Sequence, residues 1–202
     1  MKRHVAVIDA GGANLGSVTY ALERLGERPH IIRSAEGLHN ATHVILPGVG
    51  TASEAMKRLL AQGLLVPLQQ LQVPLLGVCL GMQLLFCFSE EGAINCLGLI
   101  PGNIRAIPAT QHQRVPHMGW NRLQHTSTSS QLLEGIKNGD WAYFVHSYAA
   151  EVTDHTIAQT THSIPFSAAV QYKHFYGVQF HPERSSNVGN RILSNFLRST
   201  VE

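Results

Sequence analysis

The chain has 202 residues, of which 44% are hydrophobic and 14% are charged. This composition is typical of a folded globular domain and excludes a disordered chain. The formal net charge is only +2 at pH 7, and the charged residues are spread along the chain. A basic surface that binds nucleic acid is therefore not expected.

Cysteine usage and hydropathy indicate the compartment. The three cysteines, Cys79, Cys87 and Cys96, form neither an even framework nor a C-x-x-C pair. A reducing compartment fits this pattern best, and we expect a cytoplasmic protein. No apolar run approaches the roughly 20 residues that span a membrane, so no membrane association is expected. The first residues briefly resemble a signal peptide, but their apolar run stops at Asp9, which favours a first strand.

The first half of the chain alternates short apolar runs with amphipathic segments. The apolar runs suit central parallel strands, and the amphipathic segments place apolar residues on one helix face. This alternation predicts a parallel sheet that is covered by helices on both faces. We expect strands at 5–8, 30–32, 44–46 and just before Cys79. We expect helices at 17–25, after an N-cap at Ser53, at 64–71, and from Leu80 to about Phe88.

From Leu97 onward the pattern changes to short strands, turns and prolines. We expect these strands to extend the sheet in a partly antiparallel arrangement, and the polar run at 124–131 to form a surface loop. A last helix at 187–197 would face Ile192, Leu193, Phe196 and Leu197 inward. The predicted strands lie at 104–107, 115–121, 143–145, 156–160, 167–171 and 175–180.

Neither a cofactor nor a metal is expected. The glycine-rich turn at 9–16 lacks the G-x-G-x-x-G spacing of a dinucleotide site, and no acidic residue follows at the expected distance. A turn that packs a helix close to a strand explains its glycines. His39 and His43 are four residues apart, but His43 enters a strand, and no H-E-x-x-H or paired Cys/His motif accompanies them.

The strongest signal of chemistry is Cys79, which lies on a predicted turn from strand to helix. Gly77 and Gly81 flank it and give the pattern G-x-C-x-G. The nucleophile elbow of hydrolases has the same layout with serine at its centre. Bulky flanking residues would collide with the strand and the helix, and the start of the helix favours a thiolate. The alternative is a small buried cysteine, but burial alone does not require the two glycines.

Two further segments follow predicted strands and should meet Cys79 at the carboxyl edge of the sheet. In the first, His181 could move protons while Glu183 accepts the other imidazole N–H and fixes the tautomer. In the second, the glycine loop at 47–50 could pair a backbone N–H with that of Leu80 in an oxyanion hole. Taken alone, a surface histidine and a plain turn remain the alternatives, because the chain has twelve histidines and glycine loops are common.

Together these segments resemble the class I glutamine amidotransferase family over nearly the whole chain. The motifs that carry the resemblance are G-V-C-L-G-M-Q at 77–83 and G-V-Q-F-H-P-E at 177–183. The resemblance implies one amidotransferase type 1 domain at 1–202. Its fold would be α/β and flavodoxin-like, with a mostly parallel central sheet flanked by helices and additional antiparallel strands. The segments 14–18, 47–50, 116–121 and 143–148 are similar to the glutaminase subunits of imidazole glycerol phosphate synthases, from histidine biosynthesis.

The resemblance also implies roles for single residues. Cys79 would attack the carboxamide of glutamine to give a thioester and ammonia, with His181 as general base and acid and Glu183 orienting it. Ammonia would pass to a partner, a (β/α)₈-barrel cyclase that makes imidazole glycerol phosphate and an aminoimidazole carboxamide ribotide. The other implied roles are oxyanion donors at Val49 and Leu80, glutamine binding by Gly50, Gln83, Glu91, Ser147 and Tyr148, and partner contacts at Asn14, Trp120 and Tyr143.

Three alternatives stay open at the level of sequence. The first is the glutaminase of another pathway, such as anthranilate or guanylate synthesis, which the segments 116–121 and 143–148 argue against. The second is a cysteine peptidase or esterase, which would not require Gln83 four residues after the nucleophile. The third is a regulatory subunit that keeps the fold without catalysis, which the intact Cys79, His181 and Glu183 disfavour.

Overall fold

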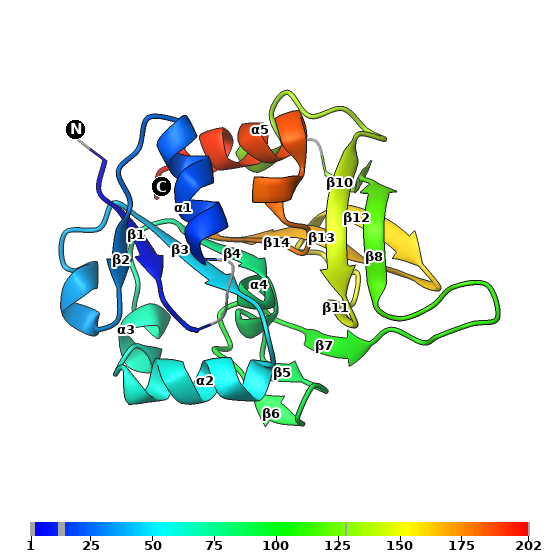
Figure 1. Ribbon diagram of the computed structural model, residues 1–202, viewed down its shortest axis with the longest axis horizontal. Coiled ribbons are helices and arrows are strands. Elements are labelled where there is room, and N and C mark those ends of the chain that lie inside the picture. The colour runs from blue at the N-terminus through cyan, green and yellow to red at the C-terminus, as the bar shows by residue number, and fades with distance from the viewer. Residues whose placement is uncertain (1–2, 12–14, 128, 202) are drawn as a thin grey trace.

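A computed structural model describes residues 3–11, 15–127 and 129–201. Within these ranges the centre of the molecule is an eight-stranded sheet with the order β2-β1-β3-β4-β14-β13-β12-β9 (Figure 1). The strands from β2 to β14 run parallel, and those from β14 to β9 pair antiparallel. The bounds are Val5–Ile8 for β1, His30–Ile32 for β2, His43–Gly48 for β3, Leu75–Cys79 for β4, Gln124–His125 for β9, Thr156–His162 for β12, Ile164–Tyr172 for β13 and Phe175–Val178 for β14.

Helices cover both faces of this sheet, as the sequence predicts. Alternate residues of β1 point to opposite faces, so Val5 and Val7 join one apolar core and Ala6 and Ile8 join the other. The helices α1 (Leu15–Arg24) and α5 (Ser186–Leu197) pack on the first core, and α2 (Ala52–Ala61), α3 (Leu65–Gln69) and α4 (Leu80–Leu84) on the second (Figure 1). In the described part of the chain, no helix has the length and apolar character needed to cross a membrane.

Two smaller sheets lie beside the carboxyl edge of the central sheet. One is an antiparallel ribbon of β8 (His117–Arg122) and β10 (Trp141–His146). The other has the order β11-β7-β5-β6. The additional antiparallel strands are therefore confirmed, although only β9, β12 and β13 extend the central sheet itself. The bounds of the second small sheet are Phe88–Ser89 for β5, Ile94–Asn95 for β6, Asn103–Ala106 for β7 and Tyr148–Ala150 for β11.

Three local predictions are wrong in part. The helix after Cys79 ends at Leu84 instead of near Phe88, because the N–H of Cys87 bonds to the carbonyl of Gly102 and the chain turns into β5. An apolar run of this length fits a helix or a buried strand equally well. The N-cap of α2 is Thr51 and not Ser53, and the Oγ1 atom of Thr51 accepts a hydrogen bond from the Glu54 N–H at 3.4 Å. The predicted loop at 124–131 begins with the edge strand β9.

Candidate active site

Cys79 is the last residue of β4, and α4 begins at the next residue. Its backbone has φ 55° and ψ −112°, a conformation that a side chain with a Cβ atom rarely adopts. Such strain costs about 1–3 kcal/mol and persists where the surrounding structure enforces it. The sharp turn that the glycine pattern predicts is therefore present in the fold.

The glycines around this turn are required by packing. A Cβ atom on Gly77 would lie 2.6 Å from the carbonyl oxygen of Gly81, and one on Gly81 would lie 1.7 Å from that of Leu46. A Cβ atom on Gly177, on the neighbouring strand β14, would lie 2.6 Å from Cγ of Met82. The contacts at Gly77 and Gly81 are with backbone atoms and cannot be relieved by rotating a side chain, so the short helix α4 can sit against β3 and β4 only with glycine at these two positions.

Gly81→Ala is expected to destabilise the fold by at least about 3 kcal/mol, because its new methyl group would overlap the carbonyl of Leu46. Gly16→Ala is the matched control. Gly16 lies in α1 with its nearest neighbour 4.0 Å away, so alanine there should stabilise by about 0.5–1 kcal/mol. Urea unfolding of the two variants measures both changes. Equal stability of Gly81→Ala and the wild type would contradict the packing argument.

The segments at the ends of β3, β4 and β14 meet, because these strands are adjacent and parallel. Their ends border one cavity of 380 Å³. Apart from Glu183, every residue that the sequence assigns to catalysis, the oxyanion hole or glutamine binding lines it. These residues are Val49, Gly50, Cys79, Leu80, Gln83, Glu91, Ser147, Tyr148 and His181.

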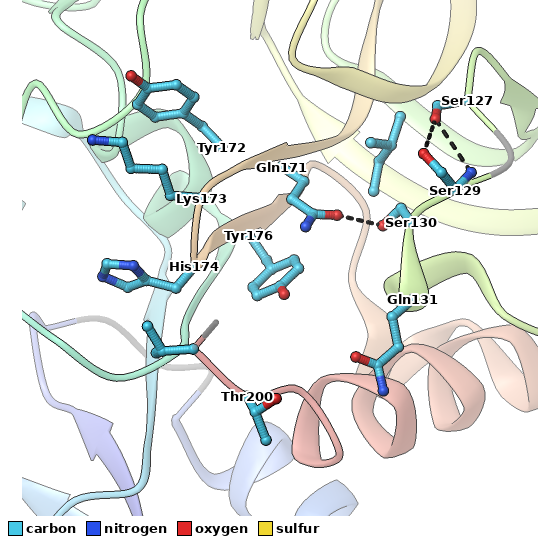
Figure 2. Close-up of a pocket in the computed structure, with 12 residues that line it drawn as sticks. Ser127, Ser129, Ser130, Gln131, Gln171, Tyr172, Lys173, His174, Tyr176 and Thr200 are labelled. Atoms are coloured by element: carbon cyan, nitrogen blue, oxygen red, sulfur yellow. Dashed lines mark hydrogen bonds between the residues drawn. The ribbon is translucent and has the colours of Figure 1, made fainter.

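A larger cavity, of 640 Å³, lies at the opposite edge of the sheet, where β14 begins (Figure 2). Figure 2 shows Gln171 of β13 reaching the hydroxyl of Ser130, at 2.6 Å. Other lining residues come from the segments 127–131, 172–176 and 200–201. None of the residues that the sequence singles out for catalysis or binding lies there, so size alone does not mark the site.

His181 and Glu183 form a buried pair on the turn after β14. Nδ1 of His181 lies 2.8 Å from Oε1 of Glu183, and the Glu183 side chain is only 1% exposed. Burial by itself would lower the pKa of His181, but hydrogen bonds and charges from the side chains of Cys79 and Glu183 raise it to about 10. His181 therefore keeps its proton through neutral pH. Because Nδ1 faces the carboxylate, Nε2 is the nitrogen directed at the sulfur.

Two residues that the sequence analysis did not single out hold this arrangement. Ser185 is buried, and its hydroxyl donates to the carbonyl of His181 at 2.7 Å and accepts from the N–H of Tyr143 at 2.9 Å. The N–H of His181 in turn donates to the carbonyl of Tyr143, at 2.9 Å. Gln179 is fully buried, with Nε2 3.7 Å from Sγ of Cys79. Gln179 falls within the G-V-Q-F-H-P-E motif at 177–183, but neither the motif nor its spacing assigns a role to Gln179 or to Ser185.

The comparisons with known proteins agree with this geometry. A family model described as glutamine amidotransferase class-I matches residues 6–200. The chain belongs to this family. It is 59% identical over 193 residues to the imidazole glycerol phosphate synthase subunit HisH of Xanthomonas campestris pv. campestris (strain 8004), covering 96% of each chain. The subunit HisH of Xylella fastidiosa (strain Temecula1) is 58% identical, again with 96% of each covered.

Solved structures with low sequence identity show the same fold. A putative GMP synthase protein from Thermoplasma acidophilum superposes with a TM-score of 0.74 at 18% identity, covering 98% of this chain and 93% of that one. PurLQS from Thermotoga maritima gives 0.74 at 16% identity and covers 98% of each chain. The predicted family and fold class of this amidotransferase are therefore confirmed, while the roles of single residues stay predictions.

His146 lines the amidotransferase cavity, and a second buried histidine, His117, lies behind it. Nδ1 of His146 lies 2.8 Å from the carbonyl oxygen of Tyr148, and Nε2 of His146 lies 3.0 Å from Nδ1 of His117. A carbonyl only accepts, so His146 carries its proton on Nδ1 and accepts from His117. Burial lowers the pKa of His146 to about 3 and that of His117 to about 4, so both rings are neutral at pH 7.

These histidines should make the amidotransferase sensitive to acid. A folded-state pKa below the usual 6.5 means that the unfolded chain binds more protons once the pH falls below 6.5, so stability is lost from there towards pH 4. Between pH 6.5 and pH 4.5 the free energy of unfolding of His117→Asn should fall by about 2 kcal/mol less than that of the wild type. Denaturant unfolding at the two pH values measures the difference. Equal losses in the variant and the wild type would show that His117 titrates normally.

The outer face of the ribbon β8–β10 carries an aromatic patch made of Met118, Trp120, Trp141 and Tyr143. Trp120 is 50% exposed, and its ring centroid lies 5.9 Å from that of Tyr143. Arg122 lies over the ring of Trp141, and Arg184 over that of Tyr143. Large exposed apolar groups that gather on one face mark an interaction surface. Of the three predicted partner contacts, Trp120 and Tyr143 lie in this patch, and Asn14 lies outside the described residues.

Proposed function

We propose that this amidotransferase is the cytoplasmic glutaminase subunit of an imidazole glycerol phosphate synthase. It hydrolyses glutamine to glutamate and ammonia and passes the ammonia to a (β/α)₈-barrel cyclase subunit. The cyclase uses it to make imidazole glycerol phosphate and AICAR from PRFAR in histidine biosynthesis. The observation that carries the proposal is the single cavity that Cys79, His181, Val49 and Leu80 share, in a chain 59% identical to HisH relatives.

The first half of the reaction forms the thioester. The sulfur of Cys79 attacks the side-chain carboxamide carbon of glutamine, and the carbonyl oxygen becomes an oxyanion. The N–H groups of Val49 and Leu80 stabilise that charge. When the tetrahedral intermediate collapses, the C–N bond breaks and protonated His181 delivers its proton from Nε2 to the leaving nitrogen, which departs as ammonia. The raised pKa of His181 supports this role, because the acid is charged before glutamine arrives.

The second half hydrolyses the thioester. His181, now neutral, takes a proton from water, and the resulting hydroxide attacks the γ-glutamyl carbonyl carbon. The same two N–H groups stabilise the second oxyanion. The C–S bond then breaks. Glutamate leaves, and the sulfur of Cys79 is free again for the next turnover. Glu183 accepts from Nδ1 throughout and stabilises the positive charge of the imidazolium.

Glutamine recognition falls to the rest of the cavity. The carboxylate of Glu91 lies at the start of α2, where Oε2 accepts from the N–H of Ala52 at 2.7 Å. This contact fixes the carboxylate at the cavity wall, where it can bind the ammonium group of glutamine. Backbone groups of Gly50, Ser147 and Tyr148 and the side chain of Gln83 contact the remainder of the substrate.

The cyclase binds at the aromatic patch, which strand β10 connects to the catalytic residues. The ring of Tyr143 belongs to the patch, and its backbone bonds to the N–H of His181 and the hydroxyl of Ser185. Two residues further along β10, the carbonyl oxygen of Val145 lies 3.8 Å from Sγ of Cys79. A partner that presses on the patch therefore acts on the strand that holds the histidine and touches the nucleophile.

The purified chain alone is expected to be a poor glutaminase that the cyclase activates. Gly50 has φ +98° and only Glu54 within 4 Å of its Cβ position, so the Val49–Gly50 backbone has room to turn. If one oxyanion donor points away at rest, turnover falls by about 10²–10³-fold. The test compares glutamine turnover by the chain alone, with the cyclase, and with the cyclase plus its nucleotide ligand. Equal rates in all three would rule out activation.

The same turnover assay, carried out with increasing concentrations of the cyclase, tests whether the aromatic patch binds it. Trp120→Ala should weaken cyclase binding by at least about 30-fold, because buried tryptophans at interfaces contribute about 2 kcal/mol or more. Leu60→Ala is the control, since Leu60 is 65% exposed on α2, a helix that lies apart from the β8–β10 ribbon in Figure 1. If the chain binds no barrel cyclase but activates another ammonia-dependent synthase, it serves a different pathway.

A further inference from the structure

A buried row of hydrogen bonds ends at the sulfur of Cys79. Nε2 of Gln83 lies 2.8 Å from the carbonyl oxygen of Tyr148 and 3.0 Å from Oε1 of Gln179. Nε2 of Gln179 lies 3.7 Å from Sγ of Cys79. The side chains of Gln83 and Gln179 are both buried, so these contacts are made away from water.

The donor and acceptor of every bond in this row follow from the Tyr148 carbonyl at its far end from the sulfur. The Tyr148 carbonyl can only accept, so the amide nitrogen of Gln83 must face it. That nitrogen also contacts the near atom of the Gln179 amide, which must then be the oxygen. The far atom of Gln179 is therefore its NH₂ group, and this group faces the sulfur. The orientation of Gln179 is thus set by backbone and not by an arbitrary choice between O and N.

A second donor fixes the carbonyl itself. The Nδ1–H group of His146 donates to the same Tyr148 oxygen at 2.8 Å, so both lone pairs of the oxygen are used. His146 in turn accepts from His117. The peptide group between Tyr148 and Ala149 is held by two side chains from different elements, and Gln83 cannot rotate without leaving a buried N–H group unpaired.

We propose that Gln179 is a further catalytic residue, whose side-chain N–H donates a hydrogen bond to the Cys79 sulfur and stabilises it as a thiolate. The inference rests on the proposed function and adds a residue to it. Beside protonated His181 the sulfur carries a full negative charge, and the N–H bond to it is then strong. In the thioester the sulfur is neutral and the bond weakens. The bond therefore favours the reactive form over the acylated one.

Alkylation of Cys79 by iodoacetamide, followed by peptide mass spectrometry over a range of pH, tests the bond without glutamine. Gln179→Glu keeps the oxygen that Gln83 needs and replaces the N–H donor by a carboxylate oxygen, which is an acceptor and, when ionised, also adds a negative charge beside the sulfur. Gln179→Met removes the amide at nearly constant length. Both variants should raise the pH midpoint of Cys79 alkylation by about one to two units, since a hydrogen bond to a charged group is lost.

Gln171→Glu is the matched control. Gln171 lies on the adjacent strand β13 at the other edge of the sheet, and its Oε1 accepts from Ser130, a contact that glutamate keeps (Figure 2). The midpoint should not move in this variant. An unchanged midpoint in both Gln179 variants, with unfolding curves like that of the wild type, would overturn the proposal. A wild-type chain that does not hydrolyse glutamine even with the cyclase and its nucleotide ligand present would instead overturn the proposed function, because alkylation is measured without turnover.

A second experiment needs no substitution of Gln179, so it tests the proposal even if the Gln179 variants fail to fold. The side-chain NH₂ group of Gln179 gives two proton resonances in a ¹⁵N-labelled protein. One of them should lie downfield and exchange slowly because it faces the sulfur, and Cys79→Ala should move it upfield. If neither resonance shifts in Cys79→Ala, no bond to the sulfur exists and the proposal is wrong.

Discussion

Cys79→Ser is expected to reduce glutamine-dependent turnover by at least about 10³-fold while leaving the fold and partner binding nearly intact. A hydroxyl is a far weaker nucleophile than a thiolate, and serine cannot form the thioester. The change removes one sulfur atom from a buried site that glycine contacts define, so the turn itself should persist. The measurement is ammonia release by the complex of the variant with the cyclase, supplied with glutamine.

Cys87→Ser is the control for this prediction. Cys87 is an exposed free cysteine beyond the end of α4, and it does not line the cavity. Its replacement should leave turnover unchanged. Cyclase activity with added ammonium salt should also survive in Cys79→Ser, because the barrel protein then receives ammonia directly. Glutamine turnover near the wild-type rate in Cys79→Ser would exclude Cys79 as the nucleophile.

The sequence is sufficient to predict the main features of the site because they depend on local backbone geometry. Gly77 and Gly81 around Cys79 are explained by contacts within a few residues and with the adjoining strands. The meeting of Val49, Cys79 and His181 follows from the rule that adjacent parallel strands end at one edge. Strand β14 pairs with β4 as that rule requires, although about 100 residues separate them.

The residues that sequence analysis missed act through long-range contacts between ordinary polar side chains. Gln179 reaches Cys79 across 100 positions, and His117 reaches His146 across 29. Gln179 and His117 both fall within segments that carry the family resemblance, but no local pattern shows which distant side chain each of them contacts. The predicted helix after Cys79 is too long because here a local pattern is present but a distant contact overrides it. Its apolar run satisfies helix periodicity, but a strand pairing of Phe88 with Asn103 ends it.

His181→Ala is expected to lower turnover by about 10²–10⁴-fold, the usual contribution of a positioned acid or base. Alanine removes the proton donor that the leaving nitrogen requires and the base that activates water. The loss should appear in kcat more than in KM, because His181 acts on the reacting atoms. Glu183→Gln should be less damaging, at about 10–100-fold, since the glutamine oxygen can still accept from Nδ1 and only the charge is lost.

The burial of Glu183 limits how far its loss can be compensated. Its side chain is 1% exposed, so water cannot enter to take its place, and substitution by glutamine tests the charge alone. Without the carboxylate, the pKa of His181 should fall from about 10, which NMR titration of the imidazole can follow. A lower pKa leaves less imidazolium at pH 8 than at pH 6, so the rate defect of Glu183→Gln should grow as the pH rises. If Glu183→Gln proves more damaging than His181→Ala at every pH, the carboxylate does more than orient and charge the histidine, and the division of roles proposed for the pair is wrong.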